Sequence, residues 1–260
     1  MTDPRARRLA AVRAKIAALE GAGSARRGTL PFGAPEIDDC FPEGGLPLGR
    51  WHEIAGEGMD AEVSAAPAAF AALLAAPLLR RGHGVWILRR DDLYAPGLAG
   101  LGLAAERMIA VSVRDTTEAL GVMEEALCAA GVSVVIAEAE TVDLAVGRRL
   151  QLACERGGAT GFVLRRTPYG GGSSRPQKAA AAATRWRVRA APSAPAPLGL
   201  GSPRWEVSLE RCRGGRTGAW LLEASRIFTW EARDDAHPLR LVAGLGAREL
   251  APAPSIRRSA

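Results

Sequence analysis

The chain has 260 residues, 48% of them hydrophobic, which is enough to form one large domain or two small ones. Its longest apolar stretch, residues 65–79, contains two prolines and is too short to cross a bilayer, and the basic N-terminus lacks the apolar core of a secretory signal. The four cysteines form no C-x-x-C pair and the three histidines are isolated, so we expect a cytoplasmic protein with reduced thiols and no bound metal.

The charge is distributed unevenly. Residues 1–30 carry seven Lys/Arg and two acids, and residues 165–189 carry seven Lys/Arg and no acid. These segments have net charges of +5 and +7 against a total of +6, so the rest of the chain carries −6. Two basic patches on an acidic body suit a nucleic-acid backbone, although an acidic protein partner or an ordinary solvated surface fits the charges as well.

The first predicted element is a helix over residues 4–20. Its apolar residues Leu9, Val12, Ile16 and Leu19 are spaced 3, 4 and 3 apart and form a one-sided stripe. Glycines end the helix, and a basic link follows at 24–28. We therefore expect residues 1–28 to form an arm whose stripe packs either on its own core or on another protein.

From residue 29, short apolar runs alternate with helical patterns. We predict strands at 51–55, 84–88, 108–112, 132–137 and 161–165, with helices at 64–80, 97–105, 116–130 and 144–156, the third of them capped by Asp115. This alternation predicts an α/β fold with a parallel sheet covered on both faces.

The pattern changes after residue 165. Residues 167–184 are rich in Gly, Ser and Ala, whereas 186–189, 205–212 and 219–224 alternate apolar and polar residues. We predict that these last three segments add antiparallel strands, including a hairpin, to one edge of the sheet. The core then spans 29–232, and the Pro/Ala/Arg-rich residues 233–260 form a loosely ordered tail.

Residues 56–63 read GEGMDAEV and lie between the predicted strand at 51–55 and the helix at 64–80. This is the setting of a phosphate-binding loop, whose pattern is G-x-x-x-x-G-K-[ST]. Gly56 matches the first glycine. Ala61, Glu62 and Val63 replace the second glycine, the lysine and the hydroxyl residue, so the groups that hold phosphate and magnesium are missing.

Several stretches resemble a known family. The segment GGLPLGRWHEIAG (44–56) resembles the entry to the ATPase core of RecA-like recombinases. A closer resemblance is to the ImuA family, the RecA-like members of the bacterial inducible-mutagenesis cassette. It is carried by LPFGAPEIDD, RRLQLACE, GFVLRRTP, ATRWRVRAAPSAP and LERCRGG, and it extends from about residue 5 to residue 224.

This resemblance implies a RecA-like three-layer core with a mostly parallel sheet and antiparallel strands at one edge. It also assigns the positions of the ATPase residues. The phosphate-binding lysine corresponds to Glu62, the magnesium hydroxyl ligand to Val63, the water-activating carboxylate to Arg90, and the magnesium-side aspartate to Glu138. Only the last change is conservative, so we expect no catalytic residue, no nucleotide cofactor and no enzymatic activity.

The resemblance also locates DNA-binding candidates. The first DNA-binding loop of recombinases has no room between Glu138 and Phe162, whereas the second corresponds to about 167–184. Side chains in and around it could follow phosphates of single-stranded DNA weakly. They are Arg165, Arg166, Arg175, Lys178, Arg185 and Arg187. In the alternative interpretation, Arg185 and Arg187 only cover the outer face of a strand.

The function implied by the resemblance is that of a non-catalytic adaptor in the SOS response. Its expected partners are ImuB, a catalytically inactive relative of Y-family polymerases, together with the RecA filament and an error-prone C-family DNA polymerase. One alternative is an ATP-dependent recombinase-like enzyme, which Glu62 disfavours. Another is a SulA-type cell-division inhibitor, which the length of the chain and the basic segment 165–189 disfavour.

Overall fold

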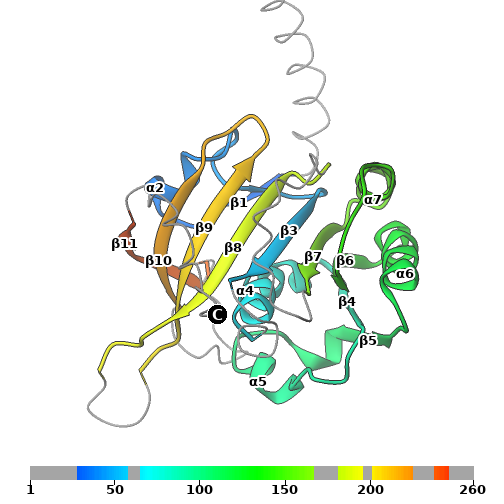
Figure 1. Ribbon diagram of the computed structural model, residues 1–260, viewed down its shortest axis with the longest axis horizontal. Helices are drawn as coiled ribbons and strands as arrows, with labels where there is room; N and C mark the ends of the chain where they lie inside the picture. Colours follow the sequence, from blue (N-terminus) through cyan, green and yellow to red (C-terminus); the bar gives the residue numbers. More distant parts are fainter. Residues whose placement is uncertain (1–27, 58–64, 167–180, 196–200, 225–236, 246–260) are drawn as a thin grey trace, which may run out of the picture.

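A computed structural model describes residues 28–57, 65–166, 181–195, 201–224 and 237–245 (Figure 1). Their main feature is one mixed sheet of nine strands in the order β11-β10-β9-β8-β3-β7-β6-β4-β5. The strands are β3 (Trp51–Gly56), β4 (His83–Leu88), β5 (Met108–Ser112), β6 (Val132–Ala139), β7 (Thr160–Arg165), β8 (Thr184–Ala191), β9 (Arg204–Cys212), β10 (Gly218–Ala224) and β11 (Leu239–Gly244). A small antiparallel pair, β1 (Thr29–Leu30) and β2 (Leu46–Pro47), lies outside this sheet.

The strand pairing of the sheet changes from parallel to antiparallel at β8. Strands β8, β3, β7, β6, β4 and β5 pair in parallel, whereas β8–β9, β9–β10 and β10–β11 pair antiparallel. In register, His52 of β3 lies beside Thr184 of β8 and Phe162 of β7. The predicted mostly parallel sheet with antiparallel strands at one edge is therefore confirmed.

Helices cover both faces of the parallel strands and complete the three layers of the predicted α/β, RecA-like core (Figure 1). One face packs against α4, and the other packs against α6 and α7. The helical elements are α2 (Pro35–Asp38), α4 (Ala65–Ala75), η1 (Ala76–Arg81), α5 (Ala95–Ala99), η2 (Ala105–Arg107), α6 (Thr116–Cys128) and α7 (Leu144–Gly157). Among the residues with described placement, no helix combines the length and apolar character needed to cross a membrane.

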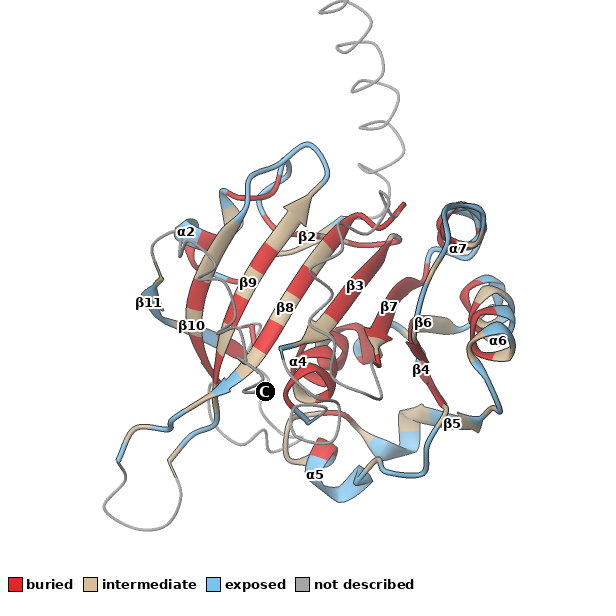
Figure 2. Cartoon of the chain, viewed as in Figure 1, coloured by how far each residue is buried: buried red, intermediate tan, exposed pale blue. Residues whose placement is uncertain are grey.

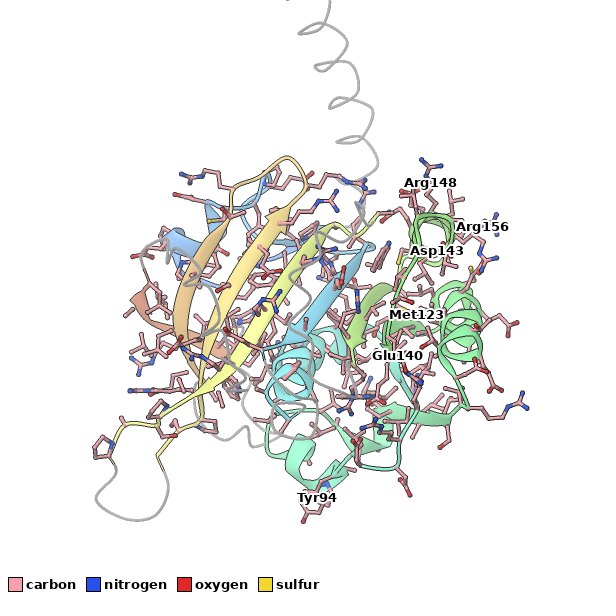
Figure 3. The ribbon with its side chains drawn as sticks, in the orientation of Figure 1. Tyr94, Met123, Glu140, Asp143, Arg148 and Arg156 are labelled. Atoms are coloured by element: carbon pink, nitrogen blue, oxygen red, sulfur yellow. The ribbon has the colours of Figure 1, made fainter. Side chains whose placement is uncertain are left out.

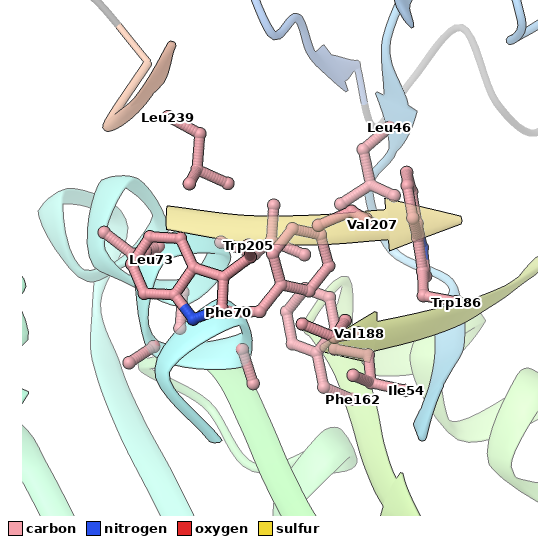
Figure 4. Packing of buried hydrophobic residues seen from close by; sticks show 14 of the residues in the cluster. Leu46, Ile54, Phe70, Leu73, Phe162, Trp186, Val188, Trp205, Val207 and Leu239 are labelled. Atoms are coloured by element: carbon pink, nitrogen blue, oxygen red, sulfur yellow. The ribbon is translucent and has the colours of Figure 1, made fainter. Parts of the chain in front are cut away.

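The larger core cluster lies on the α4 face and extends under the antiparallel strands (Figure 4). Trp186 is fully buried in this cluster. Its ring centroid lies 5.5 Å from that of Phe70 of α4 and 6.5 Å from that of Trp220 of β10. Val188 is buried on the same face of β8, so the alternation predicted for this strand is confirmed. Burying such side chains contributes about 1.5–3 kcal/mol each and fixes which face of the strand points inward.

The second cluster lies between the sheet and helices α6 and α7. Trp51 is fully buried there, and its indole N–H donates to the Gly147 carbonyl of α7 at 2.9 Å. Both helices begin at a capping aspartate, because Asp115 accepts from the Glu118 amide and Asp143 from the Val146 amide. The N-cap predicted at Asp115 is thus confirmed.

Two predictions for the body need correction. The single helix expected at 97–105 is instead α5 and the short η2, separated by a turn at Gly100 and Gly102, because glycine lowers the stability of a continuous helix. The helix expected at 64–80 becomes the 3-10 helix η1 after Ala75, where Pro77 removes an amide donor.

The C-terminal segment also differs from the expectation of a loosely ordered tail. Residues Leu239–Gly244 form β11, the outer strand beside β10. Leu239 is buried and Leu241 packs against the core, whereas Arg240 is exposed. This two-residue alternation was present in the sequence, but the strand forms through backbone pairing with β10.

Candidate functional site

The carboxyl ends of β3, β7, β6 and β4 lie side by side at one edge of the sheet. Ligands of open α/β sheets bind outside this edge, and the degenerate phosphate loop follows β3 here. Gly56 is the last residue of β3. The other loop positions, Ala61, Glu62 and Val63, lie outside the described residues.

Glu138, near the end of β6, is the central charged group of this edge and is fully buried. Its Oε1 accepts from Arg166 Nη2 at 2.5 Å, and its Oε2 accepts from the backbone amide of Arg89 at 3.0 Å. Arg166, directly after β7, also contacts Asp92 Oδ1 at 3.0 Å. Glu138 therefore uses both oxygens on groups of its own chain, and Arg166, a DNA-binding candidate from the sequence, is drawn into the edge of the sheet.

The surrounding charges at this edge are also paired. Arg89, just after β4, forms an ion pair with Glu140 at 2.9 Å, and Glu57, just after β3, lies 3.9 Å from Arg189 of β8. Arg90, at the position of the water-activating carboxylate, is exposed. Cations and anions that follow different strands thus pair with one another at this edge. Within this set, Glu138 is the buried partner of Arg166.

A second buried carboxylate, Glu53, lies in the middle of β3 and joins three neighbouring strands. Its Oε1 accepts from Arg165 of β7 at 2.8 Å, and its Oε2 accepts from Arg185 of β8 at 3.0 Å. Glu53 is 3% exposed, whereas the side chains of Arg165 and Arg185 are 9% and 20% exposed. Two more DNA-binding candidates are therefore held by a carboxylate that lies 112 and 132 residues away in sequence.

The face of the antiparallel strands that is opposite Trp186 and Val188 carries further ion pairs. Arg187 pairs with Glu210 of β9, and Arg189 pairs with Glu206 of the same strand. The hydrogen bond that Arg189 donates to Glu206 raises the pKa of Arg189. On the next strands, hydrogen bonds from Arg240 and Arg204 lower the pKa of Glu223. This face is a ladder of opposite charges, which stabilises neighbouring strands.

The sequence pattern singles out basic residues of this ladder but does not identify their acidic partners. The available signal was the alternation Glu206-Val207-Ser208-Leu209-Glu210, which puts two acids on the polar face of the strand next to β8. The remaining DNA-binding candidates, Arg175 and Lys178, and the arm residues Leu9, Val12, Ile16 and Leu19 lie outside the described residues.

His52 of β3 is fully buried on the opposite face of the sheet from Glu53 and belongs to a chain of hydrogen bonds. Its Nε2 lies 3.0 Å from the Pro47 carbonyl, so Nε2 carries the hydrogen and Nδ1 accepts from the Thr184 hydroxyl at 2.8 Å. The Trp186 indole in turn donates to Thr184 Oγ1 at 2.7 Å. Burial lowers the pKa of His52 to about 3, so this imidazole is a neutral structural group.

Metal and thiol chemistry find little support in the part of the chain that the structure describes. No group of three or more His, Cys, Asp or Glu side chains there is arranged to hold a metal ion. The four cysteines are free thiols, and burial raises the pKa of Cys212 to about 11, which keeps it in the weakly nucleophilic thiol form.

Comparison with known proteins gives a clear family relation. The chain matches no protein-family model. It is 52% identical over 236 residues to Protein ImuA of Caulobacter vibrioides, from strain NA1000 / CB15N and equally from strain ATCC 19089 / CIP 103742 / CB 15. Each alignment covers 88% of this chain and 95% of the relative. With this identity over nearly the full length, the chain belongs to the ImuA family.

Proposed function

We propose that this protein is a non-catalytic accessory protein of DNA-damage-induced mutagenesis, which acts as an adaptor for ImuB. Membership of the ImuA family supports the role in the ImuA/ImuB mutagenesis system. The adaptor role is supported by the chemistry of the strand edge where a RecA-like enzyme would bind nucleotide. By the same proposal, the RecA filament and an error-prone C-family polymerase are further partners.

The observation that carries the non-catalytic part is the state of Glu138. A magnesium-side carboxylate must present an oxygen to the ion or its water shell. In this chain Glu138 is fully buried and occupied by Arg166 and by the Arg89 amide. Breaking one partner out of a buried ion pair costs about 3–5 kcal/mol, so freeing Glu138 would weaken nucleotide binding by about 100-fold or more.

Glu62 adds a second penalty. It replaces the lysine of the phosphate loop in the sequence. A carboxylate about 4 Å from a triphosphate oxygen adds a repulsion of about 4 kcal/mol at an effective dielectric constant near 20. The missing lysine attraction and this repulsion act in the same direction, which supports a protein retained for its surfaces.

Titration calorimetry and a binding assay test the two parts separately. We expect no binding of MgATP with a Kd below about 1 mM, which corresponds to about −4 kcal/mol, and no release of phosphate. Micromolar MgATP binding would contradict the non-catalytic part. We expect purified ImuB to bind the immobilised chain, and the tubulin-like target of SulA-type inhibitors to show no binding; the reverse result would contradict the adaptor part.

A further inference from the structure

The outward side of α7 carries a row of alternating leucines and arginines. We call Leu144, Arg148, Leu152 and Arg156 the α7 row. They follow one another at intervals of four residues and so lie along one side of the helix. Leu144 and Leu152 are 47% and 53% exposed, and both arginines are exposed and point away from the body (Figure 3). At 1.5 Å per residue the row is about 18 Å long.

The α7 row has no structural task within the described part of the chain. The opposite side of the helix is buried (Figure 2). Leu150 and Cys154 on that side belong to the core cluster between the sheet, α6 and α7. Arg148 and Arg156 form no ion pair with any carboxylate in the described ranges. Another molecule could therefore pair with the two arginines and bury the two leucines.

The flanks of the row differ from the row itself. On one side Arg149 pairs with Glu124 of α6 at 3.2 Å. On the other side Glu155 accepts from Arg50 at 3.1 Å and from Gln151 at 2.9 Å. The α7 row thus combines exposed leucines with arginines that pair with no carboxylate of the described ranges. Charged neighbours that bind their own chain border it, which gives a polar rim and a partly apolar centre.

We propose that the α7 row docks an acidic amphipathic helix of a partner protein. Carboxylates of that helix would pair with Arg148 and Arg156, and apolar side chains spaced one turn apart would cover Leu144 and Leu152. The inference rests on the adaptor function and takes ImuB as the partner that supplies the helix.

Charge selects this occupant over the chain's own terminal segments. Residues 1–27 carry seven Lys/Arg against two acids, and residues 246–260 carry three Arg against one Glu. Both segments, whether from the same molecule or from a second copy, would bring positive charge to a positive row. Nucleic acid fits the arginines but gains nothing from two leucines at this spacing, because phosphate recognition is electrostatic.

The test measures binding of purified ImuB to the full-length chain by biolayer interferometry at about 0.15 M NaCl, where exposed charges still act over about 8 Å. The variants are Arg148→Glu, Arg156→Glu, their double variant, and Leu152→Gln. Arg81→Glu is the matched control, since Arg81 is exposed and lies outside α7. Unchanged circular dichroism and urea midpoints show that each variant folds.

We expect the double charge reversal to weaken ImuB binding at least about tenfold, Leu152→Gln about threefold or more, and the Arg81 control less than about twofold, as for a central as opposed to a remote contact. Equal binding by all variants would overturn the α7 row and leave the adaptor function standing. Absence of ImuB binding to the unaltered chain would overturn both.

A single-stranded oligonucleotide, measured on the same variants, separates the remaining possibility. If the α7 variants lose oligonucleotide binding while they keep ImuB binding, the row is a phosphate-binding surface and the proposal is wrong. Retained oligonucleotide binding together with lost ImuB binding supports it.

Discussion

Replacing Glu53 by Gln should destabilise the fold strongly although the two side chains have nearly the same shape. The carboxylate is 3% exposed and accepts three charge-assisted hydrogen bonds, one from Arg165 at 2.8 Å and two from Arg185 at 3.0 and 3.2 Å. The amide of Gln would remove the negative charge that these two adjacent guanidinium groups share. Removing one partner of a buried pair costs about 3–5 kcal/mol.

Partial exposure of Arg185 limits this loss, because water can solvate its guanidinium group. We therefore expect about 4 kcal/mol, a large part of the about 5–15 kcal/mol by which domains are stable. Urea unfolding followed by tryptophan fluorescence measures it, with the slope m checked for a two-state transition. In a double-mutant cycle with Arg185→Gln, the two losses should overlap by more than about 1 kcal/mol, because the residues are in contact.

Glu210→Gln provides the matched control. It is the same substitution on β9, the strand that follows β8 in the sheet, but the side chains of Glu210 and its partner Arg187 are both 26% exposed. Pairs of this kind contribute about 1 kcal/mol or less. The reasoning would be refuted by a loss below about 1 kcal/mol for Glu53→Gln, or by equal losses for both variants.

Three further results are expected. Burial lowers the pKa of His52 to about 3 and of His237 to about 4. The unfolded chain takes up these protons first, so the free energy of unfolding should fall by about 1.4 kcal/mol per histidine for each pH unit below about 6.5. His52→Gln should make this fall with pH less steep in urea titrations at pH 7, 6 and 5. Glu138→Gln should cost about 3–5 kcal/mol, because it removes the buried negative charge that Arg166 contacts, and it should not create MgATP binding in calorimetry. Glu140→Gln, on a 44% exposed side chain, should cost under about 1 kcal/mol. Asp143→Ala should cost about 1 kcal/mol in thermal unfolding through loss of the α7 cap. A variant whose stability equals that of the unaltered chain would count against the contact that it removes.

The sequence predicted most of the sheet because its strands are defined by local patterns. The apolar run at 132–137 indicated a buried strand, and the Arg/Trp alternation at 186–189 indicated that Trp186 and Val188 point inward; both are confirmed. β11 escaped prediction because a six-residue outer strand within a Pro- and Arg-rich segment becomes evident only when β10 is in place.

The candidate site was less predictable because its contacts join residues that are distant in sequence. Nothing local to Arg165 indicates that Glu53, 112 residues earlier, accepts its hydrogen bond. Phosphate binding remained a natural interpretation of these arginines for that reason. A weak signal existed in His52 and Glu53 themselves, since a polar pair inside a buried strand requires partners from neighbouring strands.

The hydrogen bonds from Trp186 through Thr184 and His52 to Pro47 all run in one direction, each group donating to the next. A proton added at His52 Nδ1 would turn that acceptor into a donor and force the Thr184 hydroxyl to reorient. Because His52 and Thr184 are register neighbours on β3 and β8, this reversal would fall where the parallel and antiparallel parts of the sheet meet. Acid strong enough to protonate His52 in the folded protein, near its pKa of about 3, should therefore loosen the junction between the parallel and antiparallel parts of the sheet.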